Sequence, residues 1–512
     1  MHNQQQDHNQ RSNTSSKTAY QKLSEHFEHL AHLEGTASML HWDSAVMMPT
    51  GAATSRALHL STLKVLIHQS LTDQIVPTLI AEALTQNELT PWQRANLREI
   101  KRSHIHAAAV PTELVKALSQ AGSHCEMIWR QARQDNDFAR LTPALEQVIQ
   151  LTQEVAQIKG EALGCTPYEA LLDQYEPGAS VQQIDRIFDT LMQELPHIME
   201  AALERQERID QQGIITLDGS FSISNQKQLG LTLMEALGFD FERGRLDVSL
   251  HPFCGGIPSD VRITTRYHEE DFTQSLMGII HETGHALYEQ GLPQEWIWQP
   301  VGRARGMSVH ESQSLFMEMQ IGRSEAFIEY MTPIAQNLFH GQGPGWTSDN
   351  LYKHYTRVER SLIRVDADEV TYPAHVILRY QLEQALLNGD LLVQDLPTAW
   401  NEAMQKYVGI QPDQDKNGCM QDIHWMDGSL GYFPTYTLGA MTAAQLGQSM
   451  RQQLTDCDNQ IRQGDFSAIL QWLRNNVHAH ASVYSTDELL TQATGRPLEV
   501  DPFVQHLKAR YT

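Results

Sequence analysis

Cysteine is scarce in this sequence. Only 5 of the 512 residues are Cys, and no two of them form a CxxC pair. A disulfide framework or a thiolate zinc site needs more cysteines at closer spacing, so the sequence argues against both. We expect reduced, mostly buried thiols, as in a cytoplasmic protein. The cysteines are Cys125, Cys165, Cys254, Cys419 and Cys457.

Basic residues and long apolar runs are also lacking. Lys and Arg total 38 against 62 Asp and Glu, which gives a formal net charge of −24. A protein that binds nucleic acid or an anionic membrane needs a basic surface, so we expect neither partner. No stretch approaches the roughly 18 apolar residues of a membrane span. Residues 1–16 are polar and lack the apolar run of a signal peptide, so we expect a disordered tail and a cytoplasmic location.

The rest of the chain is dominated by helical patterning. Apolar residues step by three and four near the N-terminus, at Tyr20, Leu23, Phe27 and Leu30. The same spacing recurs in residues 466–477, and most segments between are rich in good helix formers. There is no fixed-period repeat and no long linker. We therefore expect a mainly α fold in which residues 17–512 form one domain.

Residues 246–267 (LDVSLHPFCGGIPSDVRITTRY) break the helical pattern. Val261, Ile263 and Thr265 alternate with polar residues at period two, and a Gly-Gly pair and a proline precede them. This pattern predicts a short hairpin or a small antiparallel sheet. Such a sheet offers an edge to an extended peptide or is a plain structural hairpin, and these residues alone leave both open.

The strongest motif follows directly, because residues 281–285 read HETGH, an H-E-x-x-H pattern. Residues four apart lie on one helix face, so His281 and His285 can bind one zinc ion. Glu282 then lies beside the metal-bound water and is a candidate general base. The alternative is a histidine pair that only satisfies surface or core polarity.

A tetrahedral catalytic site needs a third protein ligand. No third histidine follows at short range, so a later carboxylate is the remaining solution. Glu289 lies on the same helix face but too far along to close a tetrahedron. We favour Glu311 modestly, with a solvated helix carboxylate as its alternative. The candidates are Glu289, Glu295, Glu311, Glu318 and Glu325.

A set of ordered motifs makes the chain similar to a known family. The sequence resembles the carboxypeptidase Taq family of thermostable zinc metallocarboxypeptidases, with a segment at 42–49 extending the likeness toward the N-terminus. Six motifs occur in the family's order: HPF (251–253), DVRIT (260–264), HETGH (281–285), HESQ (310–313), IRVDAD (363–368) and GCMQDIHW (418–425).

The resemblance implies a fold and a site. It implies a mostly helical protein with a deep central groove, a small sheet beside the zinc helix, and a homodimer. It implies one Zn²⁺ bound by His281, His285 and Glu311, with Glu282 as the general base. Co²⁺ or Mn²⁺ can substitute in a site of this kind.

A carboxypeptidase must also recognise a free C-terminal carboxylate, for which arginine is the preferred partner. Arg364 is the first choice, because the family's arginine in this motif resembles the carboxylate anchor. Its alternative is a structural pair with Asp366 or Asp368. Arg262 is the second choice, although an ion pair with nearby Asp260 is the favoured interpretation of that residue.

Three further residues are candidates for stabilising the oxyanion that forms during hydrolysis. His424 can donate to the substrate carbonyl, and Tyr432 or Tyr436 can supply a phenol to the same oxygen. Ordinary packing with a satisfied polar tip is the alternative for each. Asp422 is a candidate for orienting His424 or a ligand.

We therefore expect a zinc metallocarboxypeptidase that releases single amino acids from peptides with free C-termini, with broad specificity and poor action on C-terminal proline. His251 and Phe253 are candidates to line the substrate groove, or else to serve the turn at Pro252. Two rivals remain: an oligopeptidase that cleaves internally with a structural Arg364, and a non-catalytic helical protein with a vestigial metal site. The intact Glu282 argues against the second rival.

Overall fold

The computed structural model describes residues 17–209 and 213–512, so the predicted tail at 1–16 lies outside the described residues. Helices dominate, as predicted, and no described helix is long and apolar enough to cross a membrane. The first eight are α1 (Ala19–Val46), α2 (Ala53–Leu71), α3 (Ile75–Leu84), α4 (Pro91–Ala108), α5 (Thr112–Asp135), α6 (Phe138–Leu163), α7 (Pro167–Leu172) and α8 (Val181–Ile209).

The remaining helices lie around and after a small sheet, which follows α9 in the chain. Those in the middle of the chain are α9 (Ile223–Ala236), α10 (Thr273–Gly291), α11 (Met307–Leu315), α12 (Glu325–Phe339), α13 (Ser348–Tyr355) and α14 (Tyr372–Asn388). Those near the C-terminus are α15 (Leu396–Tyr407), α16 (Pro434–Gln453), α17 (Cys457–Arg462), α18 (Ser467–Asn476), α19 (Thr486–Thr494) and α20 (Asp501–Tyr511).

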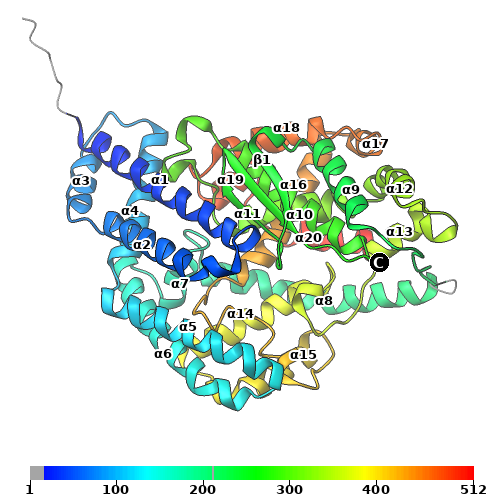
Figure 1. Ribbon diagram of the computed structural model, residues 1–512, viewed down its shortest axis with the longest axis horizontal. Coiled ribbons are helices and arrows are strands. Elements are labelled where there is room, and N and C mark those ends of the chain that lie inside the picture. The colour runs from blue at the N-terminus through cyan, green and yellow to red at the C-terminus, as the bar shows by residue number, and fades with distance from the viewer. Residues whose placement is uncertain (1–16, 210–212) are drawn as a thin grey trace, which may run out of the picture.

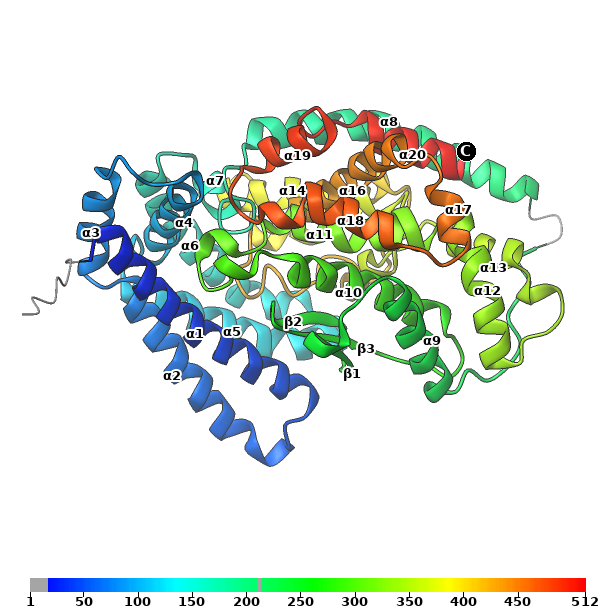
Figure 2. The same cartoon turned by 90° about the horizontal axis from the view of Figure 1, so that it is seen from above.

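The helices form two halves in the view of Figure 1. Helices α5, α6, α14 and α15 occupy the lower half, while α10, α11, α16 and the sheet lie in the upper half. From above, α1 and α2 form a long antiparallel pair beside the sheet, and α8 runs along the opposite side next to α20 (Figure 2).

The predicted amphipathic faces are buried as expected. Tyr20, Leu23, Phe27 and Leu30 of α1 form a small core with α3 and α4. A much larger core joins the helices from α5 to α20. Its central helix is α16, which is buried along almost its whole length and packs closely against α11. Small residues of α16 permit this approach, since a Cβ on Gly439 would lie 2.8 Å from the Cβ of Glu311.

The three-stranded sheet corrects the sequence prediction in one respect. Its strands are β1 (Gly244–Val248), β2 (Phe253–Ile257) and β3 (Asp260–Thr265), in the order β1-β3-β2. The hairpin of β2 and β3 is antiparallel, as predicted, but β1 pairs with β3 in parallel, so the sheet is mixed. The parallel pairing is possible because residues 249–252 and the whole of β2 lie between the two strands, which gives the chain room to return.

Strand β3 is largely buried. Val261, Ile263, Thr264 and Thr265 are buried, and the strand packs against α10. The sheet thereby holds α10 from one side, while α11 and the π-helical turn η6 (Phe316–Gly322) hold it from the other. A helix fixed on both sides presents its remaining face, the one that carries the HETGH motif, in a defined direction.

Candidate active site

Helix α10 carries His281, Glu282 and His285, and α11 carries Glu311. One donor atom from each of His281, His285 and Glu311 lies within 4.8 Å of the other two. The Nε2 atom of His285 is 3.5 Å from Oε2 of Glu311. The structure thus brings together the three residues that the sequence analysis favoured as ligands. Among the described residues they form the one such group of histidine, cysteine and acidic side chains.

A glycine in the motif lets the two helices approach. A Cβ on Gly284 would lie 2.3 Å from the carbonyl oxygen of Gln313 and 2.6 Å from the Cα of Ser314, both on α11. Contacts this short do not occur for a real side chain, so the position requires glycine. Without this close packing, the carboxylate of Glu311 could not reach the histidines of α10.

The orientation of His281 is set by a carboxylate behind it. Nδ1 of His281 lies 2.9 Å from Oε2 of Glu318. Glu318 belongs to a π-helical turn, η6 (Phe316–Gly322), and also accepts a hydrogen bond of 2.7 Å from Arg323. A carboxylate on Nδ1 keeps the proton there and leaves Nε2 free for a metal. Glu318, an open candidate for the third ligand, therefore contacts the candidate ligand His281 instead.

The orientation of His285 is set by the backbone of α11. Its Nδ1–H donates to the carbonyl oxygen of His310 at 3.0 Å, which leaves Nε2 facing Glu311. The ring of His310 in turn contacts Glu289 at 2.9 Å, so this further candidate ligand is also engaged elsewhere. In the described part of the chain, Glu295 and Glu325 do not line the cleft around these residues.

The electrostatics of the site suit a divalent cation. Burial raises the pKa of Glu282 to about 7 and also raises the pKa of Glu311. Burial works to lower the pKa of His281, but the hydrogen bond that its Nδ1–H donates to Glu318 and the neighbouring carboxylates raise it to about 10. Three buried carboxylates, those of Glu282, Glu311 and Glu318, thus lie close to the two imidazoles of His281 and His285. A set of two His nitrogens and one carboxylate is a typical catalytic zinc site.

These residues face a cleft of about 840 Å³. The predicted groove residues His251 and Phe253 line it from β2 and the turn before it, and Arg364, Tyr432 and Tyr436 line it from the other side. His424 lies just behind, with Nε2 3.4 Å from the hydroxyl of Tyr436 and its ring against Phe433. The candidates for substrate binding and oxyanion stabilisation, with one exception, therefore gather at one site.

That exception is Arg262, which the structure places outside the cleft. Its guanidinium binds both carboxylate oxygens of Asp260 at 2.6 and 2.7 Å and stacks on Trp42 at 4.4 Å. Among the residues that the structure describes, Arg262 is not one of those that line the cleft. The structure therefore corrects the assignment of Arg262 as a substrate-binding residue and agrees with the ion pair that the sequence analysis favoured.

Arg364 is buried in the wall of the cleft, with a relative exposure of 6%. Its Nε and Nη2 donate to Oδ1 of Asp422 at 3.0 and 2.9 Å, and its Nη1 donates to the hydroxyl of Tyr372 at 3.1 Å. The alternative partners Asp366 and Asp368 are not used; Asp368 instead accepts backbone N–H groups at the turn before α14. Arg364 lies on the short 3-10 turn η8 (Arg364–Asp366).

Asp422 also has a different role from the predicted one. Its other oxygen binds Arg379 of α14 at 2.7 Å, and it makes no hydrogen bond to His424 among the described contacts. Burial works to raise the pKa of Asp422, but the charges of Arg379 and Arg364 hold it well below its usual range. Two buried arginines therefore share one carboxylate, and the group carries one surplus positive charge beside the cleft.

Sequence reasoning missed several residues of the site. Tyr372 and Arg379 support the Arg364 group, and Arg323 supports Glu318. The motifs gave only an indirect signal, since Tyr372 and Arg379 follow the IRVDAD segment within a few helical turns. His310 belongs to one of the motifs, but it orients His285 through its backbone carbonyl. Any residue type has that carbonyl, so the sequence gives no signal for this role.

The comparisons with known proteins agree on one family. A sequence model of the Carboxypeptidase Taq (M32) metallopeptidase family matches residues 22–511. The Thermostable carboxypeptidase 1 of Thermus thermophilus is 38% identical over 97% of this chain and 98% of that protein. Carboxypeptidase 1 of Bacillus subtilis is 33% identical over 94% and 96%.

Solved structures show the same fold. The metallocarboxypeptidase 1 of Trypanosoma cruzi superposes with a TM-score of 0.94 at 41% identity, covering 96% of this chain and 99% of the other. The M32 carboxypeptidase of Deinococcus radiodurans superposes with a TM-score of 0.90 at 33% identity, covering 97% and 99%.

Proposed function

Because the chain belongs to the carboxypeptidase Taq (M32) family and is a metallocarboxypeptidase, we propose that it releases single amino acids from the C-termini of peptides, with one zinc ion held by His281, His285 and Glu311. The paired Nδ1 contacts of the two histidines support this ligand set, since they leave both Nε2 atoms for the metal.

One observation carries the exopeptidase assignment: the buried Arg364, Arg379 and Asp422 group has a surplus positive charge and faces the same cleft as the metal site. A buried charge without a partner is costly, so such a group favours an anionic ligand. Arg364 uses Nε, one Nη2–H and one Nη1–H in known contacts, which leaves one N–H on each terminal nitrogen. Those two donors match the two oxygens of a substrate carboxylate.

Glu282 is the proposed general base. A bound zinc ion supplies Lewis acidity and brings the pKa of a coordinated water toward neutrality. Burial raises the pKa of the Glu282 carboxylate to about 7, which suits a group that accepts a proton and then returns it. We propose that Glu282 takes the proton of the attacking water and passes it to the leaving amine.

Tyr432, Tyr436 and His424 are the proposed donors to the developing oxyanion. The two tyrosines lie against each other in the cleft wall, with ring centroids 5.2 Å apart, and burial raises the pKa of Tyr436 to about 12. A neutral phenol keeps its proton and donates a hydrogen bond at any working pH. Burial also lowers the pKa of His424 to about 4, which keeps this imidazole neutral.

The edge of the sheet offers a surface for the peptide chain. In the order β1-β3-β2, β2 is an outer strand, and His251 and Phe253 face the cleft from its beginning. An extended peptide can pair with such an edge. Its far end is covered, because Ser38 of α1 donates to the carbonyl of Gly256 at 2.9 Å.

Broad side-chain specificity, poor action on C-terminal proline, a homodimer, a cytoplasmic location and a single domain over 17–512 remain proposals from the sequence and the family resemblance. Co²⁺ or Mn²⁺ in place of zinc has the same standing. The proposed substrates are peptides with a free C-terminal carboxylate.

The test is mass spectrometry of a peptide digest with and without a chelator. We expect a ladder of single-residue losses from the C-terminus, and we expect chelation to abolish it. Internal fragments from the same peptide would instead support the rival oligopeptidase. No cleavage by the metal-loaded protein would support the rival binding protein.

A further inference from the structure

Helix α11, which carries Glu311, begins without a capping side chain of its own. Its N-cap is Gly306, and the first N–H groups of a helix have no partner within the helix. Here the partners come from another segment. The N–H of Met307 donates to the carbonyl of Tyr175 at 2.6 Å, and the N–H of Ser308 donates to Oε2 of Glu176 at 3.0 Å. Glu176 is 132 residues away from Ser308 in the sequence.

The carboxylate of Glu176 is fixed at this position. It is 5% exposed, and the hydroxyls of Ser308 and Thr486 donate to its two oxygens. A Cβ on residue 306 would lie 2.6 Å from Oε2 of Glu176, so the glycine N-cap leaves the space that the carboxylate fills. A negative charge at a helix N-terminus is also favoured by the helix dipole.

The segment that carries Glu176 is itself anchored to the other half of the molecule. Residues 173–178 follow α7 and contact α4 and α6. His106 of α4 binds the Asp173 carboxylate at 2.7 Å, and Lys159 of α6 donates to Gln174 at 2.9 Å. The segment that supplies the cap is therefore held in place by contacts to α4 and α6.

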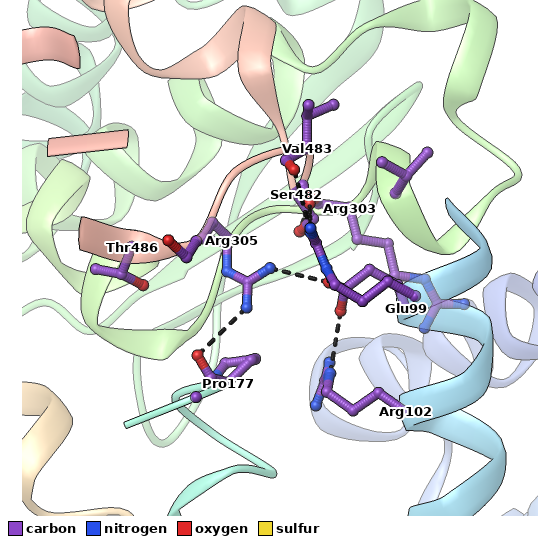
Figure 3. A network of polar contacts seen from close by, with 12 residues as sticks. Glu99, Arg102, Pro177, Arg303, Arg305, Ser482, Val483 and Thr486 are labelled. Atoms are coloured by element: carbon purple, nitrogen blue, oxygen red, sulfur yellow. Dashed lines mark hydrogen bonds and ion pairs between the residues drawn. The ribbon is translucent and has the colours of Figure 1, made fainter. Parts of the chain in front are cut away.

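A second buried contact holds the start of α11 from the other side. Figure 3 shows Arg305 between Glu99 of α4 and the carbonyl of Pro177, with N–H···O distances of 3.1 and 3.4 Å. The backbone N–H of Arg305 donates to the hydroxyl of Tyr288 on α10 at 3.0 Å. The residues just before α11 are thus tied to α10, α4 and the Glu176 segment together.

We propose that Glu176 is a positioning residue for the metal site, acting through α11. The first turn of this helix contains His310, whose carbonyl orients His285, and Glu311 follows directly. Loss of the cap lets the first turn fray, which moves both groups relative to α10. The inference rests on the proposed metal site at His281, His285 and Glu311.

The test measures metal binding by the full-length protein, well below its melting temperature. Glu176→Ala, Glu176→Gln and wild type are compared for Zn²⁺ affinity by chelator competition and for the visible absorption of the Co²⁺ form, which reports ligand geometry. We expect Glu176→Ala to bind Zn²⁺ about 10-fold or more weakly and to change the Co²⁺ spectrum. Glu176→Gln keeps an acceptor for Ser308 and should remain within about 3-fold of wild type.

The matched control is Asp137→Ala. Asp137 also caps a helix with its carboxylate, accepting the N–H of Arg140 at 3.1 Å, but α6 contributes no residue to the cleft in the described chain. We expect unchanged metal affinity in this variant. If Glu176→Ala does not fold, Gly306→Ala replaces it, since the added Cβ displaces the carboxylate, and the same weakening is expected.

The outcomes separate the inference from the function on which it rests. Unchanged Zn²⁺ affinity and an unchanged Co²⁺ spectrum in Glu176→Ala, or in Gly306→Ala, would overturn the positioning role, whatever happens to thermal stability. Wild type that binds no metal would instead overturn the proposed metal site. Weakened binding in Glu176→Ala and in Asp137→Ala alike would also overturn the inference, because any lost cap would then have the same effect.

Discussion

The assignment of Arg364 as the carboxylate anchor predicts a selective loss of activity. Replacing Arg364 with Gln removes the two free N–H donors but leaves Asp422 paired with Arg379 at 2.7 Å, so no buried charge is stranded and the fold should survive. The group changes from a net charge of +1 to neutral. Removing one partner of a buried, hydrogen-bonded charge pair costs about 3 kcal/mol, which corresponds to a loss of about 150-fold in kcat/KM.

The assay compares one peptide as its free acid and as its C-terminal amide. Wild type should prefer the free acid by about the same 150-fold, because the amide lacks the charge that Arg364 binds. In Arg364→Gln the preference should fall toward one, mainly through loss of activity on the acid. Arg262→Gln is the control, since Asp260 and Trp42 hold that arginine away from the cleft. An acid-to-amide ratio that stays high in Arg364→Gln, or is low in wild type, would refute the reasoning.

Four further predictions follow from the geometry. Glu282→Gln should keep its metal, because the three ligands are untouched, and lose about 10³-fold in kcat; metal analysis and turnover under saturating substrate check both. Zinc added to chelator-treated protein at about a hundred times its Kd should stabilise the fold by about 2.7 kcal/mol, whereas His285→Ala should show no such rise in melting temperature. Gly284→Ala should destabilise the protein by about 1–3 kcal/mol and weaken metal binding, since its Cβ meets Gln313; a melt combined with chelator competition tests this, and wild-type values would contradict it. Burial works to raise the pKa of Glu99, but the charges of Arg305, Arg102 and Arg98 lower it below 4.5. The ionised carboxylate of Glu99 therefore stabilises the folded protein fully above pH 4.5, and this stabilisation is lost as the pH falls further. Denaturant titrations should therefore show Glu99→Gln about 3 kcal/mol less stable than wild type at pH 7, with the difference shrinking below pH 4.5, and a constant difference would exclude this linkage.

Local features of the site were predictable from the sequence. His281 and His285 are four residues apart on a helix, and that spacing alone places both on one face. The alternation in residues 261–265 predicted a hairpin, and β2 and β3 form an antiparallel pair there. Such predictions succeed because each depends on the repeat of one element, and that repeat is set by the backbone.

Contacts between distant segments were not predictable in this way. Asp422 was a candidate for orienting His424 or a ligand, but it binds Arg364 and Arg379, which are 58 and 43 residues away. Glu318 was an open candidate for the third ligand, yet its carboxylate contacts Nδ1 of His281 instead. Their residue types fit several roles, and only the packing of α10, α11 and α14 selects one.

The sequence by itself therefore determined the helical fold class, the buried helix faces, the placement of His281 and His285 on one helix face and, through the ordered motifs, the family. The tertiary structure decided among the alternatives that the residues had left open: the carboxylate of Glu311 reaches the histidines, Arg262 is held away from the cleft, and two arginines share Asp422 beside it. The physical reason is the distance along the chain over which each property is set. The hydrophobic period and helix geometry are set within about one turn, whereas the geometry and charge balance of the site arise where helices far apart in sequence pack together.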